Sequence, residues 1–371
     1  MAATRDLWRV GRTGSLDGLR LERESVDPPG TGEVAIAVRA IGLNLADVFS
    51  CLGLYSATPP VPFTPGLEVA GVVDAVGPGR PGEAEGAARW RPGDRVIALT
   101  RFGGYATALN ADARYVRPLP DAWSFSEGAA FPVQALTAWY ALHTLAHVQP
   151  GEVVLVHSGA GGVGLNALAL LRAASAEVVT TVGSEDKRRL LADRAGLAPN
   201  RIIVRDRRRF ASQLDEALRA VGAPGFDIVL DGVAGAFFMP AFRRLRPEGR
   251  MVIFGASDMM PPGPKVNRLR LLPRYLRRPR IDPMRMISSN RSVMAFNLIW
   301  LWEQVDRLNA LYGPMAAALT EPPVVGREFP FPDAPAALRW LKSGESVGKV
   351  VLVNTRPPAG PGPAGSAGHS G

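Results

Sequence analysis

Residues 152–171 read EVVLVHSGAGGVGLNALALL, and this stretch is the strongest local signal in the chain. The apolar run 153–157 is typical of a buried strand, and the alanine- and leucine-rich run 163–174 is typical of a helix. Between them Gly159, Gly161 and Gly164 form the pattern G-x-G-x-x-G. The first glycine permits a tight turn, the second lets the backbone approach a pyrophosphate, and the third allows close packing of helix on strand. The stretch therefore predicts a dinucleotide-binding turn at a helix N-terminus, with a plain tight turn as the alternative.

Strand-like and helix-like segments alternate on the C-terminal side of this glycine loop. Strands are expected at 177–182, 202–204, 227–230, 251–254 and 292–296, and helices at 186–195, 210–221 and 235–245. Such βα repetition predicts a parallel sheet with helices on both faces. The first 120 residues carry short β-favouring runs between glycines and prolines, at 33–38, 69–76 and 95–99, which predict a mostly β unit. Beyond the parallel sheet we expect helices at 298–319 and 334–341 and a last strand at 350–353.

The end of the second strand of the parallel sheet indicates which dinucleotide binds. An NAD site places Asp or Glu there to accept from the ribose 2′-hydroxyl, but residues 180–189 read TTVGSEDKRR. Ser184 can donate to a 2′-phosphate, and Lys187 or Arg188 can neutralise it; Arg205, after the third strand, can add to the same pocket. We therefore expect NADPH as the cofactor. The alternative is that the basic residues form only a solvated helix face.

Composition and charge narrow the class of protein. The chain of 371 residues is 47% hydrophobic and 21% charged, which is typical of a globular protein. Its formal charge is +9, but no recognition motif for nucleic acid accompanies that charge, so we expect no nucleic-acid binding. Basic residues and leucines interleave in 264–283, which predicts either contact with anionic lipid or an arginine-rich surface loop.

The distribution of apolar residues along the chain predicts the location of the protein, and the residues at its two ends predict how those ends behave. No apolar run is long enough to cross a membrane, and the N-terminus lacks the apolar core of a signal peptide. We expect a cytoplasmic protein that can contact membranes peripherally. The Pro- and Gly-rich residues 355–371 are expected to form a disordered tail.

Several short motifs follow one another along the chain, among them GLNLADV (42–48), PGLEVAGVVDAVG (65–77), GAGGVG (159–164) and SVGKVVLV (346–353). In their order and spacing they resemble the zinc-independent quinone oxidoreductase branch of the medium-chain dehydrogenase/reductase superfamily. The stretch 255–298 is similar to the group around the vesicle amine transport protein. The resemblance implies an α/β fold in which a Rossmann doubly wound parallel sheet, 128–297, is inserted into a GroES-like mostly β domain made of 1–127 and 298–354.

The zinc ligands of the superfamily's alcohol dehydrogenases are missing from the matching positions. Asn44 stands where the first ligand cysteine is expected, and Leu67 stands where the ligand histidine is expected. Cys51 is the single cysteine, so the family's structural zinc lobe, which needs four, cannot form. We expect a metal-free protein. Without a Lewis acid, hydride transfer to an activated C=C bond or a quinone is favoured over alcohol oxidation.

The resemblance also implies roles for individual residues. At the active-site turn, Asn44 is expected to donate its amide to the substrate oxygen or the nicotinamide ribose, and Asp47 to position its neighbours; a structural turn pair is the alternative. Tyr55 resembles the proton donor proposed for enoyl reductase domains, or it is a packing residue. The other expected cofactor contacts are Thr137, Gly159, Ala160, Gly161, Gly162, Val163, Gly164, Asp231, Gly232, Val233, Phe254, Gly255, Phe296, Leu298 and Lys349. A plain helix threonine at 137, a core phenylalanine at 296 and a surface charge at 349 are the alternatives.

The expected function is NADPH-dependent transfer of a hydride to a small-molecule quinone or to an activated C=C bond of an enone or enoyl compound. Two alternatives stay open. One is an enoyl reductase acting on a carrier-bound, polyketide-type substrate, and the other is a membrane-associated nucleotide-binding protein with little catalysis. The family also implies a homodimer.

Overall fold

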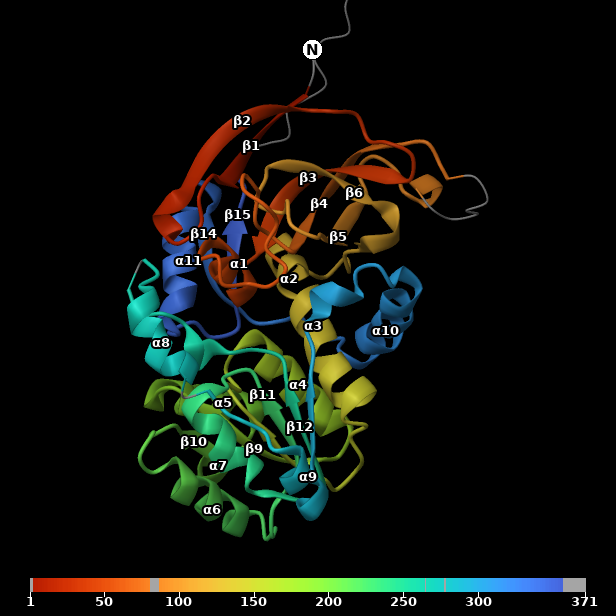
Figure 1. Ribbon diagram of the computed structural model, residues 1–371. Helices are drawn as coiled ribbons and strands as arrows, with labels where there is room; N and C mark the ends of the chain where they lie inside the picture. Colours follow the sequence, from red (N-terminus) through yellow and green to blue (C-terminus); the bar gives the residue numbers. More distant parts are fainter. Residues whose placement is uncertain (1–2, 81–86, 264, 277, 356–371) are drawn as a thin grey trace, which may run out of the picture.

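The computed structural model describes residues 3–80, 87–263, 265–276 and 278–355. Figure 1 shows two domains, one above the other, with a helix running between them. Except for Thr355, the tail expected to be disordered lies outside the described residues.

The lower domain in Figure 1 is built on a parallel sheet of six strands in the order β10-β9-β8-β11-β12-β13. This is the order of a doubly wound sheet, so the expected Rossmann fold is confirmed. The strands are β8 (Val153–Val156), β9 (Glu177–Val182), β10 (Ile202–Val204), β11 (Phe226–Asp231), β12 (Leu245–Ile253) and β13 (Ser292–Ala295). The helices are α4 (Gly162–Ala173), α5 (Glu185–Ala195), α6 (Phe210–Ala220), α7 (Phe238–Phe242), α8 (Arg268–Leu276) and α9 (Pro283–Ser289). Every residue of β8 and β11 is buried because helices cover both faces of the sheet.

The upper domain contains a sheet of seven strands in which β14-β15-β3-β4-β5-β7 follow one another and β6 also pairs with β3. A separate antiparallel ribbon is formed by β1 (Ala3–Val10) and β2 (Leu19–Val26). The sheet strands are β3 (Glu33–Gly42), β4 (Glu68–Val76), β5 (Arg95–Leu99), β6 (Ala108–Asp112), β7 (Val116–Pro118), β14 (Val325–Pro330) and β15 (Lys349–Val353). The helices are α1 (Leu45–Cys51), α2 (Phe125–Ala130) and α11 (Ala334–Ser343). Along β3 every second residue is buried, so its period of two builds the core.

The end of the chain returns to the domain in which the chain began. β15 pairs antiparallel with β3, with Val351 opposite Gly42, and β14 adds to its other side. The resulting architecture is the expected GroES-like domain with an inserted Rossmann domain, while the exact limits at 127/128 and 297/298 stay a prediction.

Two helices lie at the junction of the domains. α3 (Pro132–Trp139) runs between them and continues as a π-helical turn over Tyr140–Leu145, and α10 (Val305–Ala318) packs beside it (Figure 1). None of the helices in the described part of the chain is long and apolar enough to span a bilayer.

The prediction of a helix over 298–319 is wrong for the first third of that range. The chain forms a short 3₁₀ turn at Leu298–Leu301, and α10 begins only at Val305. The ring of Trp302 stacks on Tyr115 with centroids 3.8 Å apart, and the Tyr115 hydroxyl donates to the Trp302 carbonyl. This tertiary contact takes a carbonyl that a continuous helix needs for its own hydrogen bonds.

The helix expected over 235–245 is also shorter than predicted. The range forms a 3₁₀ turn at Gly235–Phe237 and then α7, which ends at Phe242 because Leu245 already belongs to β12, the neighbour of β11 in the sheet. Long-range pairing with a neighbouring strand therefore overrides the local helical pattern.

Candidate active site

A cavity of about 820 Å³ is lined by residues of both domains. One side consists of the glycine loop and the carboxyl ends of β9, β11, β12 and β13, where open parallel sheets bind ligands. The other side consists of the turn at 43–46, the loop at 54–56 and the segment 341–348 of the GroES-like domain. A cavity of this volume accommodates a large organic ligand.

The glycine loop has the geometry that the sequence predicts. A Cβ on Gly159 would lie 2.0 Å from Thr180 Oγ1, and one on Gly164 would lie 2.6 Å from the Gly159 Cα, so neither position admits a side chain. At Gly161 the nearest atom is the Ser158 carbonyl oxygen, 3.3 Å away, so this glycine keeps the backbone accessible. Gly161, Gly162, Val163 and Gly164 all line the cavity, as does Ala160. The loop therefore fits a pyrophosphate at the N-terminus of α4.

The GroES-like domain contacts the glycine loop directly. The Gly348 amide donates to the Ala160 carbonyl at 2.8 Å. A few residues earlier, the Gly344 and Ser346 carbonyls accept from the Lys187 ammonium at 2.5 and 2.8 Å. Lys187, at the start of α5, therefore ties the second βα unit to the other domain, and partial burial lowers its pKa. This contact could not be predicted, because its partners are backbone groups more than 150 residues away along the chain.

Of the residues expected around a 2′-phosphate, two line the cavity and two do not. Arg205 lines it, with its guanidinium donating to Thr181 Oγ1 at 2.9 Å and Ser158 Oγ at 3.2 Å, and Lys187 lines it as well. Ser184 instead caps α5 by accepting from the Lys187 amide. The Arg188 guanidinium lies 2.6 Å from the Glu185 carboxylate and outside the lining. The Arg188 side chain is therefore engaged locally, whereas the Ser184 hydroxyl accepts its bond and keeps its own hydrogen for donation to a phosphate. The roles expected of both residues stay predictions.

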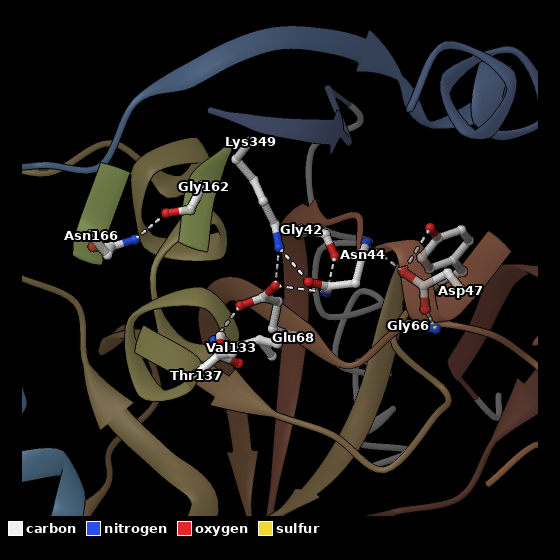
Figure 2. A network of polar contacts seen from close by, with 11 residues as sticks. Gly42, Asn44, Asp47, Gly66, Glu68, Val133, Thr137, Gly162, Asn166 and Lys349 are labelled. Atoms are coloured by element: carbon white, nitrogen blue, oxygen red, sulfur yellow. Dashed lines mark hydrogen bonds and ion pairs between the residues drawn. The ribbon is translucent and has the colours of Figure 1, made fainter. Parts of the chain in front are cut away.

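A buried ion pair between Lys349 and Glu68 contacts Asn44, which lines the cavity (Figure 2). The side chains of Lys349 and Glu68 are 1% and 0% exposed and form a short contact. Lys349 Nζ also donates to Asn44 Oδ1 at 2.8 Å, and the second Glu68 oxygen accepts the Val133 amide at 2.8 Å in the first turn of α3. Lys349 is therefore not the surface charge of the alternative interpretation, nor does it line the cavity. The pair joins β4, β15 and α3, and α3 contributes Val133 and Thr137 to the lining of the cavity.

The expected role of Asn44 as a donor to substrate is not supported. Its amide nitrogen donates to Glu68 Oε1 at 2.8 Å and to the Gly42 carbonyl at 3.3 Å, so both hydrogens are directed into the protein (Figure 2). Asn44 still lines the cavity, but its carboxamide is part of the buried network.

Asp47 organises the turn at the start of α1. Its carboxylate accepts from the backbone amide of Asn44 at 2.8 Å, the backbone amide of Gly66 at 3.2 Å and the hydroxyl of Tyr105 at 3.2 Å. It is fully buried, and this desolvation raises its pKa to about 6 despite those hydrogen bonds and the nearby Lys349 charge. Because Asp47 does not line the cavity, its position fits the expected positioning role rather than contact with a ligand.

Tyr55 and Asn297 meet across the cavity from the two domains. The Tyr55 hydroxyl donates to Asn297 Oδ1 at 2.8 Å, and both side chains line the cavity. Burial raises the pKa of Tyr55 to about 12, so its phenol keeps its proton at neutral pH. Sequence reasoning missed Asn297; the available signal was one polar residue in the apolar run MAFNLIW (294–300), directly after β13.

Most of the other expected cofactor contacts line the cavity, but Asp231 does not. Those that line the cavity are Thr137, Gly232, Val233, Phe254, Gly255, Phe296 and Leu298. The Thr137 hydroxyl donates to the Val133 carbonyl at 2.7 Å, and Phe296 is half-buried with its ring 4.9 Å from that of Tyr140. Asp231 lies outside the lining and accepts from the Val233 and Ala234 amides, which shapes the loop after β11.

The residues present do not fit a zinc ion. Within the described part of the chain, no three His, Cys, Asp or Glu side chains come together in a way that could hold a metal. Leu67 lines the cavity, and Cys51 is buried in the core of the GroES-like domain. Burial raises the pKa of the Cys51 thiol well above its usual range, which disfavours the thiolate that binds metals.

Comparisons with known proteins agree with this architecture. An alcohol dehydrogenase GroES-like domain matches residues 30–121, and a zinc-binding dehydrogenase domain matches 200–352. The mouse synaptic vesicle membrane protein VAT-1 homolog is 32% identical over 345 residues, which is 92% of this chain and 81% of that protein. Mycobacterial Rv1454c complexed with NADPH superposes with a TM-score of 0.78 at 29% identity, covering 94% of this chain and 99% of the other.

Two further solved structures cover 94% of this chain and 99% of their own chains at 29% identity. They are the CurK enoyl reductase, with a TM-score of 0.73, and a mycobacterial quinone oxidoreductase, with a TM-score of 0.72.

A GroES-like domain with an inserted Rossmann domain and a cavity between them defines a dehydrogenase or reductase of the two-domain type. More specifically, the chain belongs to the medium-chain dehydrogenase/reductase superfamily, in the zinc-independent quinone oxidoreductase branch near the VAT-1 homologues. The family recognised from the sequence motifs is confirmed, and the chain is an oxidoreductase of that superfamily.

Proposed function

We propose that this protein is an NADPH-dependent reductase that transfers a hydride to a quinone or to an activated C=C bond of an enone or enoyl compound. One observation carries the proposal: a single cavity connects the glycine loop and the cationic Lys187 and Arg205 to the Tyr55–Asn297 pair. A dinucleotide site and a proton donor therefore share one space.

The residues at the β9 and β10 end of the cavity fit a dinucleotide that carries a 2′-phosphate. The accessible backbone at Gly161 suits a pyrophosphate, and the strand end at Val182 and Gly183 offers no carboxylate to a ribose hydroxyl. The Arg205 guanidinium lies close by, because a Cβ on Gly183 would be 3.7 Å from its Nη2. Lys187 and Arg205 would hold the phosphate through charge-assisted hydrogen bonds. The mycobacterial neighbour solved with NADPH supports the same choice of cofactor.

NADPH supplies the hydride when it is bound, and the chain's own residues handle the proton. Hydride addition to an enone leaves an enolate whose α carbon must gain a proton. Tyr55 holds that proton at neutral pH because its pKa is raised to about 12. Its hydroxyl hydrogen is donated to Asn297 Oδ1, which holds the phenol at the cavity, and the transfer requires the hydroxyl to rotate from Asn297 toward the α carbon of a bound substrate. A quinone needs this donor less, since its reduced oxygen can take a proton from water.

The assay follows NADPH oxidation with a panel of quinones and enones, with NADH as the comparison cofactor. Turnover with at least one acceptor is expected, with clear preference for NADPH. Lys187→Glu should cut that preference by at least about tenfold, since it exchanges an attractive charge for a repulsive one. Arg189→Glu is the matched control, because the Arg189 side chain is 70% exposed on the same helix and pairs with Asp186. Equal use of NADH and NADPH by the wild type would refute the cofactor assignment.

A second candidate function is contact with an anionic membrane surface through 264–283. Along α8, Leu269, Leu272, Tyr275 and Leu276 are 81%, 51%, 56% and 56% exposed, which leaves an apolar stripe on the outside of the helix. The sequence surrounds the stripe with lysine and arginine and has no acid before Asp282. Exposed apolar residues among cations are what an interfacial helix presents to lipid. Pro264, Arg277 and the side chains of Arg268, Arg270 and Arg274 lie outside what the structure describes.

Flotation with phosphatidylcholine vesicles, with and without phosphatidylserine, tests the membrane proposal. The protein should float only with the anionic vesicles, and Leu272→Asp with Leu276→Asp should abolish this. Leu21→Asp is the control, because Leu21 is 46% exposed on β2, away from α8. Flotation that persists in the α8 variant, or its absence from the wild type, would reject the proposal.

A further inference from the structure

The cavity between the two domains has a charged half and an uncharged half. Lys187, Arg205 and Lys342 are the lysines and arginine in its described lining. Arg205 contacts Ser158 of the glycine loop, Lys187 contacts Gly344, and Lys342 lies two residues before Gly344. All three cations therefore lie on the side of the glycine loop and the segment 341–348 that faces it.

The other half surrounds the Tyr55–Asn297 pair and has no formal charge. It is formed by lining residues within 43–56, by Leu67, Leu99 and Thr100, and by lining residues within 295–308, all of them in the described part of the chain. No Asp, Glu, Lys, Arg or His occurs among those lining residues. Its apolar lining includes Phe49, Leu54, Leu99, Leu298, Trp302 and Leu308.

Charges near this half are already engaged. The Arg101 guanidinium, next to Thr100, lies 2.6 Å from the Glu303 carboxylate. The Arg307 guanidinium donates to Gln304 and to the Tyr140 hydroxyl and does not line the cavity. Beneath Asn44, Lys349 and Glu68 neutralise each other. An anionic group entering this half would therefore find no lining cation to replace its hydration.

The apolar wall is fixed in place. Trp302 lines the cavity, and its ring stacks on the ring of Tyr115, with an angle of 8° between the ring planes and 3.8 Å between the centroids. The Tyr115 hydroxyl holds the Trp302 backbone through its carbonyl. A side chain that is stacked and tethered in this way cannot readily move aside to let water in with a charged substrate.

We propose that the substrate class of this site is a neutral, lipophilic enone or quinone, and that the site rejects acceptors with a carboxylate or phosphate near the reacting bond. The inference rests on the proposed reductase function, whose catalytic groups lie in the uncharged half. Moving an ionised group into an uncharged apolar site is strongly unfavourable, whereas each buried methylene is favourable.

The experiment compares α,β-unsaturated methyl ketones of increasing chain length with unsaturated keto acids of equal length whose chain ends in a carboxylate, the shortest of which places the carboxylate beside the reacting bond. For the neutral series kcat/KM should rise about three- to fourfold per methylene until the apolar half is filled. The carboxylate of equal length should be at least about 100-fold worse, the ratio that corresponds to a poorly compensated charge. If kcat/KM for the carboxylates were within about threefold of kcat/KM for the neutral ketones, the inference would be overturned, because desolvation of the charge should lower it much further.

A charge-insertion variant tests the electrostatic cause directly. Leu54 lines the cavity and is 41% exposed, so Leu54→Lys can place an ammonium at the uncharged half while remaining partly hydrated. It should improve the carboxylate substrate by at least about tenfold, the size of one partly screened ion pair, and leave NADPH affinity unchanged. Leu54→Met controls for shape, and Leu21→Lys, on β2, controls for net charge. A folded Leu54→Lys protein that shows no gain would overturn the inference.

A binding measurement separates this inference from the proposed function. Saturated ketones and carboxylates of the same lengths cannot be reduced by hydride addition to C=C, and their binding can be followed through the fluorescence of Trp302 and the other tryptophans. Preferential binding of the neutral compounds without turnover of any acceptor would refute the reductase proposal and support the inference. Turnover of an acceptor, combined with equal binding of the neutral and the carboxylate compounds, would support the reductase proposal and refute the inference about the substrate class.

Discussion

Replacing Lys349 with methionine should lower the free energy of unfolding by about 4 kcal/mol. The substitution leaves the fully buried carboxylate of Glu68 without its counter-ion, which typically costs about 3 kcal/mol or more. We take the lower end because Glu68 keeps the Asn44 and Val133 donors. Asn44 Oδ1 loses its 2.8 Å contact with the ammonium, which adds about 1 kcal/mol.

Urea unfolding, followed by tryptophan fluorescence and circular dichroism, measures this loss. The double variant Lys349→Met with Glu68→Gln removes both charges and should be destabilised by no more than about 2 kcal/mol, because no buried charge is left unpaired. Arg189→Met breaks an ion pair whose side chains are 70% and 90% exposed, and it should change stability by less than about 0.5 kcal/mol. A loss below about 1 kcal/mol in Lys349→Met, or a double variant as unstable as the single one, would refute the argument that an unpaired buried charge dominates.

Further predictions concern the proton donor, the buried acid, the metal content and the assembly. Tyr55→Phe keeps the ring but removes the acid, so enone turnover should fall about 100-fold with cofactor affinity unchanged and quinone turnover less affected; intact enone turnover and product stereochemistry would show that the phenol only packs. The pKa of Asp47 is raised from 3.8 in the unfolded chain to about 6 in the folded protein. Protonation of Asp47 therefore stabilises the fold by about 3 kcal/mol below pH 4, and this stabilisation is lost as pH rises through 6. The difference in unfolding free energy between wild type and Asp47→Asn, measured from pH 4 to pH 7, should fall by that amount, and a flat difference contradicts it. Elemental analysis should find far less than one zinc per chain, and a stoichiometric zinc whose removal abolishes activity would overturn the ligand argument. Light scattering should give the mass of a homodimer, and a monomer at micromolar concentration would reject the family expectation.

Much of the dinucleotide site could be predicted because its signals are local. A strand, a glycine-rich turn and a helix follow one another within 152–171, so the steric need at Gly159, Gly161 and Gly164 is set by neighbouring residues. The strand-and-helix alternation that identifies the parallel sheet is local in the same sense. Arg188 shows the limit of this reasoning, because an i, i+3 ion pair with Glu185 competes for its side chain.

The family, most of the order of strands and helices and the absence of zinc ligands at the matching positions could be predicted from the residues alone, since each depends on which residue stands at a given position. That Lys349 is a buried partner of Glu68, 281 residues away, and that Tyr55 meets Asn297, 242 residues away, became visible in the folded chain. The folded chain also shows that the amide of Asn44 points into the protein and that the uncharged half of the cavity surrounds the proton donor. The physical reason is that burial, and with it the strength of a charge or a hydrogen bond, depends on segments that meet only when the chain returns from the Rossmann domain to complete its first sheet.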